Sequence, residues 1–147
     1  MSESVAFEDV RVGHRIETPS RTVTEADVVN FAGVSGDFYG IHTSETVAAE
    51  TAVGERVAHG ALVFSMLTGL VGRAAGDRPE VVALYGVDRL RFTAPVRIGD
   101  TVRAELERVD KEPRDHPTAS GVLRYDADVL NGDGDVVLSC ELLTLVR

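Results

Sequence analysis

The sequence has a single cysteine, a single lysine and no long apolar run, and each of these absences excludes a class of protein. With Cys140 alone, the chain can form no intramolecular disulfide and no cysteine-based zinc site, which favours a reducing compartment. Because no stretch of about 18 apolar residues is present, we expect no membrane-spanning helix. Met1–Val5 lack a basic region followed by an apolar run, so we expect no signal peptide.

Clusters of basic residues are also missing. The chain has 15 basic and 24 acidic side chains and a formal net charge of -9, which argues against nucleic acid and against anionic membranes as partners. What is present is 147 residues, of which 44% are hydrophobic, enough to enclose one sizeable core. We therefore expect a soluble, cytoplasmic protein with a single domain over residues 1–147.

The first half of the chain has the pattern of short helices. Thr24 is a predicted N-cap, because acidic residues follow it where the helix dipole favours anions. This helix should end within the glycine-containing stretch 33–36. A loop is expected over 35–42, and Ser44 should cap a second short helix that extends through Thr51.

The most apolar segment is Gly60–Ala75, which carries no charge before Arg73. It has no polar face, so we expect a helix that is largely buried. Several of its residues are small, which permits the close approach of a sheet or a ligand: Ala61, Ser65, Thr68, Gly69 and Gly72.

The second half of the chain has strand patterns. Strands are predicted over 81–94, 101–109, 118–130 and 136–146, and Asn131–Gly134 has the composition of a hairpin turn. One buried helix followed by at least four antiparallel strands predicts the α+β class, with the helix packed on a curved sheet.

Asp37 and His42 are the first candidates for chemistry. A carboxylate and an imidazole on a glycine-rich loop can supply a base and a proton donor near neutral pH. Taken alone, the spacing favours a plainer interpretation, in which Asp37 caps a turn and His42 is incidental.

His59 and Gly60 stand at the start of the apolar helix. A helix N-terminus offers unpaired N–H groups, and a glycine lets a carbonyl oxygen approach them, as an oxyanion hole requires. Alternatively, Gly60 permits a tight turn and His59 is a core histidine bonded to backbone. A metal site from Asp37, His42 and His59 is disfavoured, because the histidines lack short ligand spacing. Cys140 is expected to pack on an apolar strand face.

Three stretches of the chain carry a family resemblance. They are Phe31–His42 (FAGVSGDFYGIH), Val57–Leu62 (VAHGAL) and Arg91–Thr101 (RFTAPVRIGDT). Together they resemble the MaoC-like dehydratase family, which includes the (R)-specific enoyl-CoA hydratases. The resemblance implies a hot dog fold, in which a curved antiparallel sheet wraps a long central helix, and it implies a homodimer.

The resemblance also implies roles for individual residues. Asp37 and His42 would be the catalytic pair, and the Gly60 N–H would bind the thioester oxygen. The reaction would hydrate a trans-2-enoyl thioester of CoA or acyl-carrier protein to the (R)-3-hydroxyacyl thioester, or reverse this, with no metal or redox cofactor. An acyl-CoA thioesterase and a non-catalytic subunit that supports a catalytic partner are the alternatives.

The substrate-binding residues are less defined by the sequence. The family usually has Asn-Pro where this chain has Tyr39-Gly40, and we expect this change to reshape the acyl pocket, since glycine frees the backbone. Substrate contacts are predicted for Phe38, Tyr39, His59 and Phe64. The side chains of Arg56, Arg89 and Arg91 could meet CoA phosphates, but we favour solvated surface charges for all three.

Overall fold

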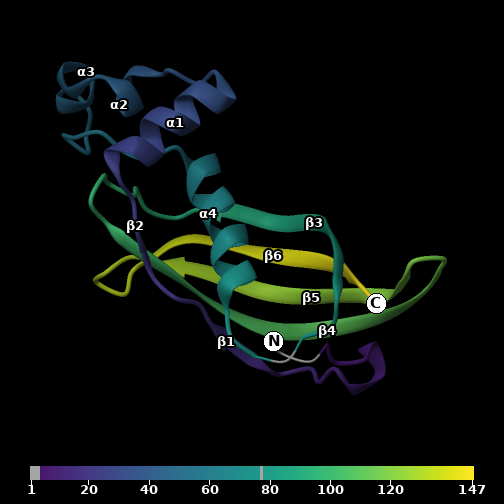
Figure 1. Cartoon of the computed structure of the whole chain (residues 1–147). Helices are drawn as coiled ribbons and strands as arrows, with labels where there is room; N and C mark the ends of the chain where they lie inside the picture. Colours follow the sequence, from purple (N-terminus) through teal and green to yellow (C-terminus); the bar gives the residue numbers. More distant parts are fainter. Residues whose placement is uncertain (1–3, 77) are drawn as a thin grey trace.

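The computed structural model describes residues 4–76 and 78–147. The expectation about a signal peptide falls partly on residues 1–3, which lie outside this range. Three short helices, α1 (Glu25–Ser35), α2 (Gly40–Thr43) and α3 (Glu45–Ala49), cluster at one end of the molecule. A longer helix, α4 (Gly60–Arg73), starts beside this cluster and runs across the sheet (Figure 1). We call residues 25–49 the helical cap.

The sheet is antiparallel and is built mainly by four long strands. In chain order, the elements besides the cap and α4 are a 3-10 turn η1 (Phe7–Asp9), β1 (Arg15–Glu17), β2 (Arg21–Thr22), β3 (Val81–Phe92), β4 (Thr101–His116), β5 (Ala119–Leu130) and β6 (Val136–Val146). The strand order is β1-β4-β5-β6-β3, and β2 pairs with β4. The turn at Asn131–Gly134 joins β5 to β6 as predicted, with Gly134 at φ 82°. The predicted α+β class is therefore confirmed.

The hydrophobic core lies between α4 and the concave face of the sheet. One face of α4 supplies Leu62, Val63, Met66, Leu67 and Leu70, all of which are buried. Alternate residues of the central strands meet them, including Val102, Ala104 and Leu106 of β4, and Leu123 and Val129 of β5. Cys140 is buried in the same core, which confirms its interpretation as a packing residue.

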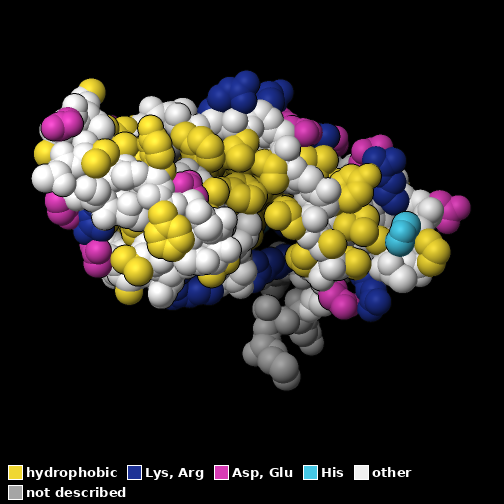
Figure 2. Space-filling model, turned by 90° about the horizontal axis from the view of Figure 1, so that it is seen from above, with side chains coloured by type: hydrophobic (Ala, Val, Ile, Leu, Met, Phe, Trp, Pro, Cys, Tyr) yellow, Lys and Arg dark blue, Asp and Glu magenta, His cyan; other side chains and the backbone are white. Residues whose placement is uncertain are grey.

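Only one side of α4 is covered, so the prediction that this helix is largely buried is wrong. The small residues Ala61, Ser65, Thr68, Gly69 and Gly72 are exposed, because the sheet packs on one face of the helix. Figure 2 shows the molecule from above. Many hydrophobic side chains lie on this face, and the face is hollowed near its middle. Within residues 4–76 and 78–147, no helix is long and apolar enough to cross a membrane.

Several predicted ends also need correction. The strand predicted to stop at residue 109 continues to His116, because it pairs with β5 as far as Ala119. β3 stops at Phe92 rather than residue 94, just before the segment that contains Pro95. Both predicted helices over 60–75 and 44–51 end two residues early, at Arg73 and Ala49.

Candidate active site

The site forms where the helical cap meets the N-terminus of α4. α1 begins with a capping box, in which the side chains of Thr24 and Asp27 each accept from the other residue's backbone N–H. It ends at Gly36, whose φ of 75° is left-handed and turns the chain away from the helix axis. The residue delivered by this turn is Asp37.

Asp37 is exposed, and its neighbours hold it in place. Its N–H donates to Ser35 Oγ at 3.1 Å. Its Oδ1 accepts from the Tyr39 N–H at 3.2 Å, the short-range bond of an Asx turn. The carboxylate is thereby oriented by backbone while it remains open to solvent.

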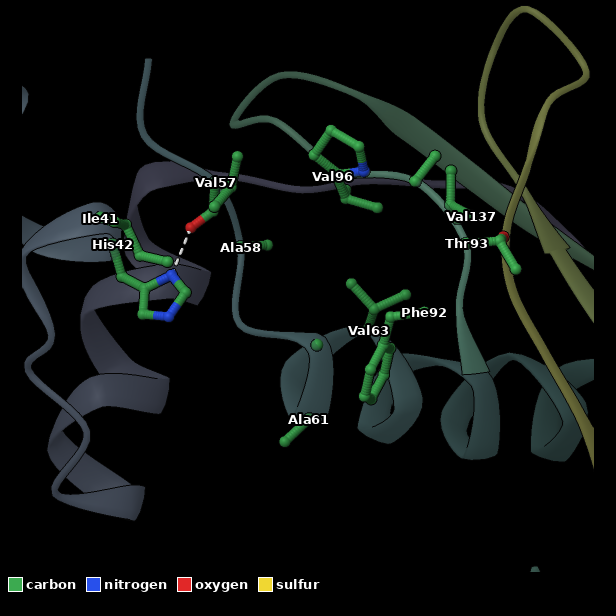
Figure 3. Close-up of a pocket in the computed structure, with 13 residues that line it drawn as sticks. Ile41, His42, Val57, Ala58, Ala61, Val63, Phe92, Thr93, Val96 and Val137 are labelled. Atoms are coloured by element: carbon green, nitrogen blue, oxygen red, sulfur yellow. Dashed lines mark hydrogen bonds between the residues drawn. The ribbon is translucent and has the colours of Figure 1, made fainter. Parts of the chain in front are cut away.

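His42 lies in α2, where the sequence predicted a loop. The single turn Gly40–Thr43 carries the imidazole inward, and the residue is 8% exposed. Its Nδ1 lies 2.7 Å from the Val57 carbonyl oxygen (Figure 3). Because a carbonyl can only accept, Nδ1 carries the hydrogen, and Nε2 is left with its lone pair as a proton acceptor.

His59 lies behind both of these residues. Its Nε2 donates to the backbone oxygen of Asp37 at 2.9 Å, and its ring stacks on that of His42 with centroids 3.8 Å apart. The ring of Phe31 meets it edge-on, and His59 is only 2% exposed. The interpretation of His59 as a core histidine bonded to backbone is confirmed, and it ties Asp37 to His42.

Asp37, His42 and His59 each present a potential metal-ligand atom, and these atoms lie within 4.8 Å of one another. The two imidazoles are nearly parallel, with an interplanar angle of 25°. In-plane lone pairs on stacked rings point side by side and do not converge on one ion as tetrahedral coordination requires. Each ring also uses one nitrogen on a backbone carbonyl. The arrangement suits proton transfer better than a shared metal ion.

The N-terminus of α4 faces the same region. His59 is its N-cap but makes no side-chain capping bond, so the N–H groups of the first turn keep their donors free. A Cβ on Gly60 would lie 2.9 Å from the ring of Phe92. Glycine therefore leaves room for the ring of Phe92 on the helix start, and a larger residue would displace that ring.

A cavity of about 530 Å³ lies beside these groups and is mostly apolar. His42 and Gly60 line it together, and Val63, Phe92 and Val137 stand among the residues that form its other walls (Figure 3). This size is within the range of small-ligand sites in proteins.

The structure places the predicted substrate-contact residues outside the cavity lining. Phe38 and Tyr39 are exposed by 62% and 68%, Phe64 packs against the core, and His59 stands behind His42. Sequence reasoning missed Phe92 and the carbonyl of Val57, although both lie inside the stretches that carried the family resemblance. Their pairing with Gly60 and His42 depends on the fold, which no local pattern displays.

Two expectations about neighbouring residues are wrong. Gly40 does not free the backbone, because it starts α2, and an added Cβ would meet Val47 at 2.8 Å. Glycine here allows α2 to touch α3. Arg56 is not a solvated charge, because its side chain is only 13% exposed and is paired with Glu25 and Glu45. Arg89 is exposed, as expected.

Comparison with known sequences gives a consistent result. The profile of the MaoC like domain family matches residues 8–129. Protein MaoC of Klebsiella aerogenes is 48% identical over 100 residues, which are 68% of this chain and 29% of that protein. The chain thus spans less than a third of this longer relative. The (R)-specific enoyl-CoA hydratase of Rhodospirillum rubrum is 38% identical over 100 residues, covering 68% of this chain and 67% of that enzyme.

Solved structures agree with the sequence comparison. A monoamine oxidase regulatory protein from Archaeoglobus fulgius superposes with a TM-score of 0.89 and 37% identity, covering 98% of this chain and 95% of that one. A Mycobacterium tuberculosis protein with a double hot dog fold has a TM-score of 0.83 at 18% identity, covering 98% and 44%. The second likeness shows the fold alone. The hot dog fold implied by the sequence resemblance is confirmed, with α4 held in the curved sheet.

Proposed function

Because the chain belongs to the MaoC-like domain family, we propose that it adds water to trans-2-enoyl thioesters, or removes it from (R)-3-hydroxyacyl thioesters. The observation that carries this proposal is the convergence of three groups at one place. The carboxylate of Asp37, the free Nε2 of His42 and the open N-terminus of α4 at Gly60 lie together beside an apolar cavity.

In this proposal, Gly60 activates the enoyl thioester as an electrophile. Its N–H donates to the thioester oxygen, and the positive end of the α4 dipole strengthens that bond. Polarising the carbonyl makes the β-carbon of the enoyl group electron-poor and stabilises the enolate that forms on attack. The apolar cavity takes the acyl chain.

Asp37 and His42 supply the proton transfers. Water donates one hydrogen bond to the carboxylate of Asp37 and another to Nε2 of His42. These two bonds turn the lone pair of the water oxygen toward the β-carbon. As the new C–O bond forms, Asp37 takes one proton from the water, and the second hydrogen stays on the new hydroxyl group. The proton on Asp37 is then returned to the α-carbon. Atoms balance without a further reactant, and the reverse sequence is dehydration.

The direct test uses the purified chain and crotonyl-CoA. We expect the enoyl absorbance to fall and (R)-3-hydroxybutyryl-CoA to appear in a chiral analysis of the product. Release of free CoA without 3-hydroxyacyl product would instead indicate a thioesterase. No turnover by the chain alone, with activity restored by a second protein, would indicate a non-catalytic subunit.

Substitution of the acid–base pair tests the residue roles. Asp37→Asn and His42→Ala should each lower kcat by about a hundredfold or more, since the first removes the proton acceptor and the second removes the group that orients the water. Asp133→Asn and His116→Ala change the same residue types at exposed positions far along the chain, and we expect full activity from both. Activity retained in either site variant would contradict its proposed role.

We also propose that two copies of this chain pair through β3 and that residues 1–147 act as one domain. β3 is one of the two terminal strands of the sheet, and its outer edge has no strand partner within the described residues. Val81, Val82, Leu84 and Tyr85 are exposed along it, which is unusual for an edge that faces water. Light scattering should give about twice the chain mass of 15.8 kDa.

A further inference from the structure

Arg56 occupies an unusual position between the helical cap and the segment that leads into α4. Its Nε donates to Glu45 of α3 at 2.7 Å, and its Nη1 donates to Glu25 of α1 at 2.9 Å. Nη2 bonds the second oxygen of Glu25. The two carboxylates are largely exposed, whereas the arginine between them is 13% exposed. One guanidinium therefore joins the two outer helices of the cap.

The same guanidinium also reaches α2. Arg56 Nη1 donates to the backbone oxygen of His42 at 3.4 Å. The next residue, Val57, donates its N–H to Ile41 O at 3.1 Å, and its carbonyl accepts from the His42 ring at 2.7 Å. Residues 56 and 57 thus hold both the main chain and the side chain of the proposed catalytic histidine.

α2 needs such support from outside. It has four residues, too few for a helix that is stable by itself, and its N-cap Tyr39 makes no side-chain capping bond. If α2 shifted relative to Val57, the Nδ1 bond would be lost, and nothing would then keep the lone pair on Nε2. The chemistry of His42 therefore depends on how firmly the cap is joined to residues 56–57.

We propose that Arg56 is a positioning residue for the hydration reaction, which holds the His42 imidazole against Val57 O so that Nε2 accepts a hydrogen bond from the attacking water. This inference rests on the proposed function. The planar fork of arginine can bond two carboxylates and a carbonyl at once, whereas a lysine ammonium is a single point charge. The hydrogen bonds with Glu25 and Glu45 raise the pKa of Arg56, so it stays charged throughout the working range.

The kinetic experiment compares Arg56→Gln, Arg56→Lys and the wild type with crotonyl-CoA. We expect kcat of Arg56→Gln to fall by about tenfold or more, with KM within about twofold of the wild type. The reason is that a displaced His42 slows the chemical step, whereas the contacts that bind the substrate stay in place. Arg56→Lys should recover part of kcat. Arg114→Gln is the matched control, since Arg114 lies near the far end of β4, where it pairs with the exposed Glu112. It should keep the wild-type kcat.

A spectroscopic experiment separates this inference from the proposed function. In protein with ¹⁵N-labelled histidine, long-range ¹H–¹⁵N spectra report which ring nitrogen carries the hydrogen. The wild type should show the Nδ1–H form of His42, and Arg56→Gln should show a mixture of both forms. An unchanged His42 signal or an unchanged kcat in Arg56→Gln would overturn the inference. A changed signal in a chain without hydratase activity would keep the positioning role and reject the function.

A second variant covers the case in which Arg56→Gln fails to fold. The double change Glu25→Gln and Glu45→Gln keeps Arg56 and removes the charges that fix it. We expect the same mixture of His42 forms and a smaller fall in kcat. If this folded double variant keeps both the His42 signal and kcat of the wild type, Arg56 does not position His42.

Discussion

At the scale of single residues, the proposed catalytic histidine, His42, lies beside two other polar side chains that are largely buried. His42, His59 and Arg56 are largely buried, and each bonds backbone or carboxylate from a different part of the chain. Buried polar groups need such partners. The site therefore depends on a few specific contacts more than on the broad hydrophobic core.

Cys140, in contrast to these polar groups, carries a potentially reactive thiol that burial makes inert. Burial raises the pKa of its thiol to about 11, and the carboxylates of Asp128 and Glu141 add to this. At pH 8 the folded thiol stays protonated, so it should react with an aromatic disulfide reagent at least about a hundredfold more slowly than in the urea-unfolded chain. Equal rates in the two states would contradict this expectation.

Residue identities predicted part of the site and missed another part for a physical reason. Asp37, His42 and Gly60 stand in short local patterns, which the sequence displays without the fold. Arg56 was misjudged because its partners Glu25 and Glu45 are 31 and 11 residues away. From sequence alone, an arginine is interpreted as a solvated surface residue, because the residues that cover it in the fold are distant along the chain.

At the scale of elements, α1 depends on its capping box. Asp27 accepts from the Thr24 N–H at 2.8 Å. Its pKa is lowered, because the hydrogen bonds to Thr24 and the charge of Arg21 outweigh the effect of burial. A lowered pKa means that the carboxylate stabilises the folded state above its unfolded pKa, and that this stabilisation is lost as pH falls through the folded value.

Asp27→Asn tests this dependence. At pH 7 it should lower the free energy of unfolding by about 1 kcal/mol, as the loss of a cap does. As the pH falls below about 4, the difference from the wild type should shrink, since the unfolded carboxylate takes up its proton first and the folded one follows at lower pH. Urea titrations at pH 7 and pH 3 measure both values. The exposed Asp133→Asn should show no difference at either pH.

α4 holds the core through one face only. Leu67 is fully buried, so Leu67→Ala should lower the free energy of unfolding by about 2–5 kcal/mol. Thr68→Ala changes the next residue, which is exposed, and should have an effect within about 0.5 kcal/mol. Urea denaturation distinguishes the two, and similar losses in both variants would contradict a one-sided core.

The elements differed in how well sequence predicted them. β6 and the turn before it were predicted correctly, because alternation and turn chemistry are local. α2 was missed, since four residues with glycine first have no helical period. The extension of β4 to His116 was missed because Pro113 lies within it, and its pairing with β5 overrides the weak strand tendency of a charged segment.

At the scale of the whole molecule, the exposed edge of β3 and the uncovered face of α4 are two surfaces that no other element covers within the described residues. A two-copy assembly through β3 would cover the edge. Tyr85→Lys places a charge on it and should shift light scattering toward the mass of one chain, because charged edges resist strand pairing. Val34→Lys is the matched control, an exposed apolar residue of α1, and should leave the mass unchanged.

The packing of Phe92 on Gly60 has a consequence for how the protein tolerates change. The two positions are separated by 32 residues in sequence, but an added Cβ at one would overlap the ring at the other. Substitutions at these positions should therefore be epistatic. Gly60→Ala should be damaging in the parent background and tolerated better beside Phe92→Leu, whose side chain has no ring. A library that varies both positions at once would recover pairs of residues that single-position scans would reject.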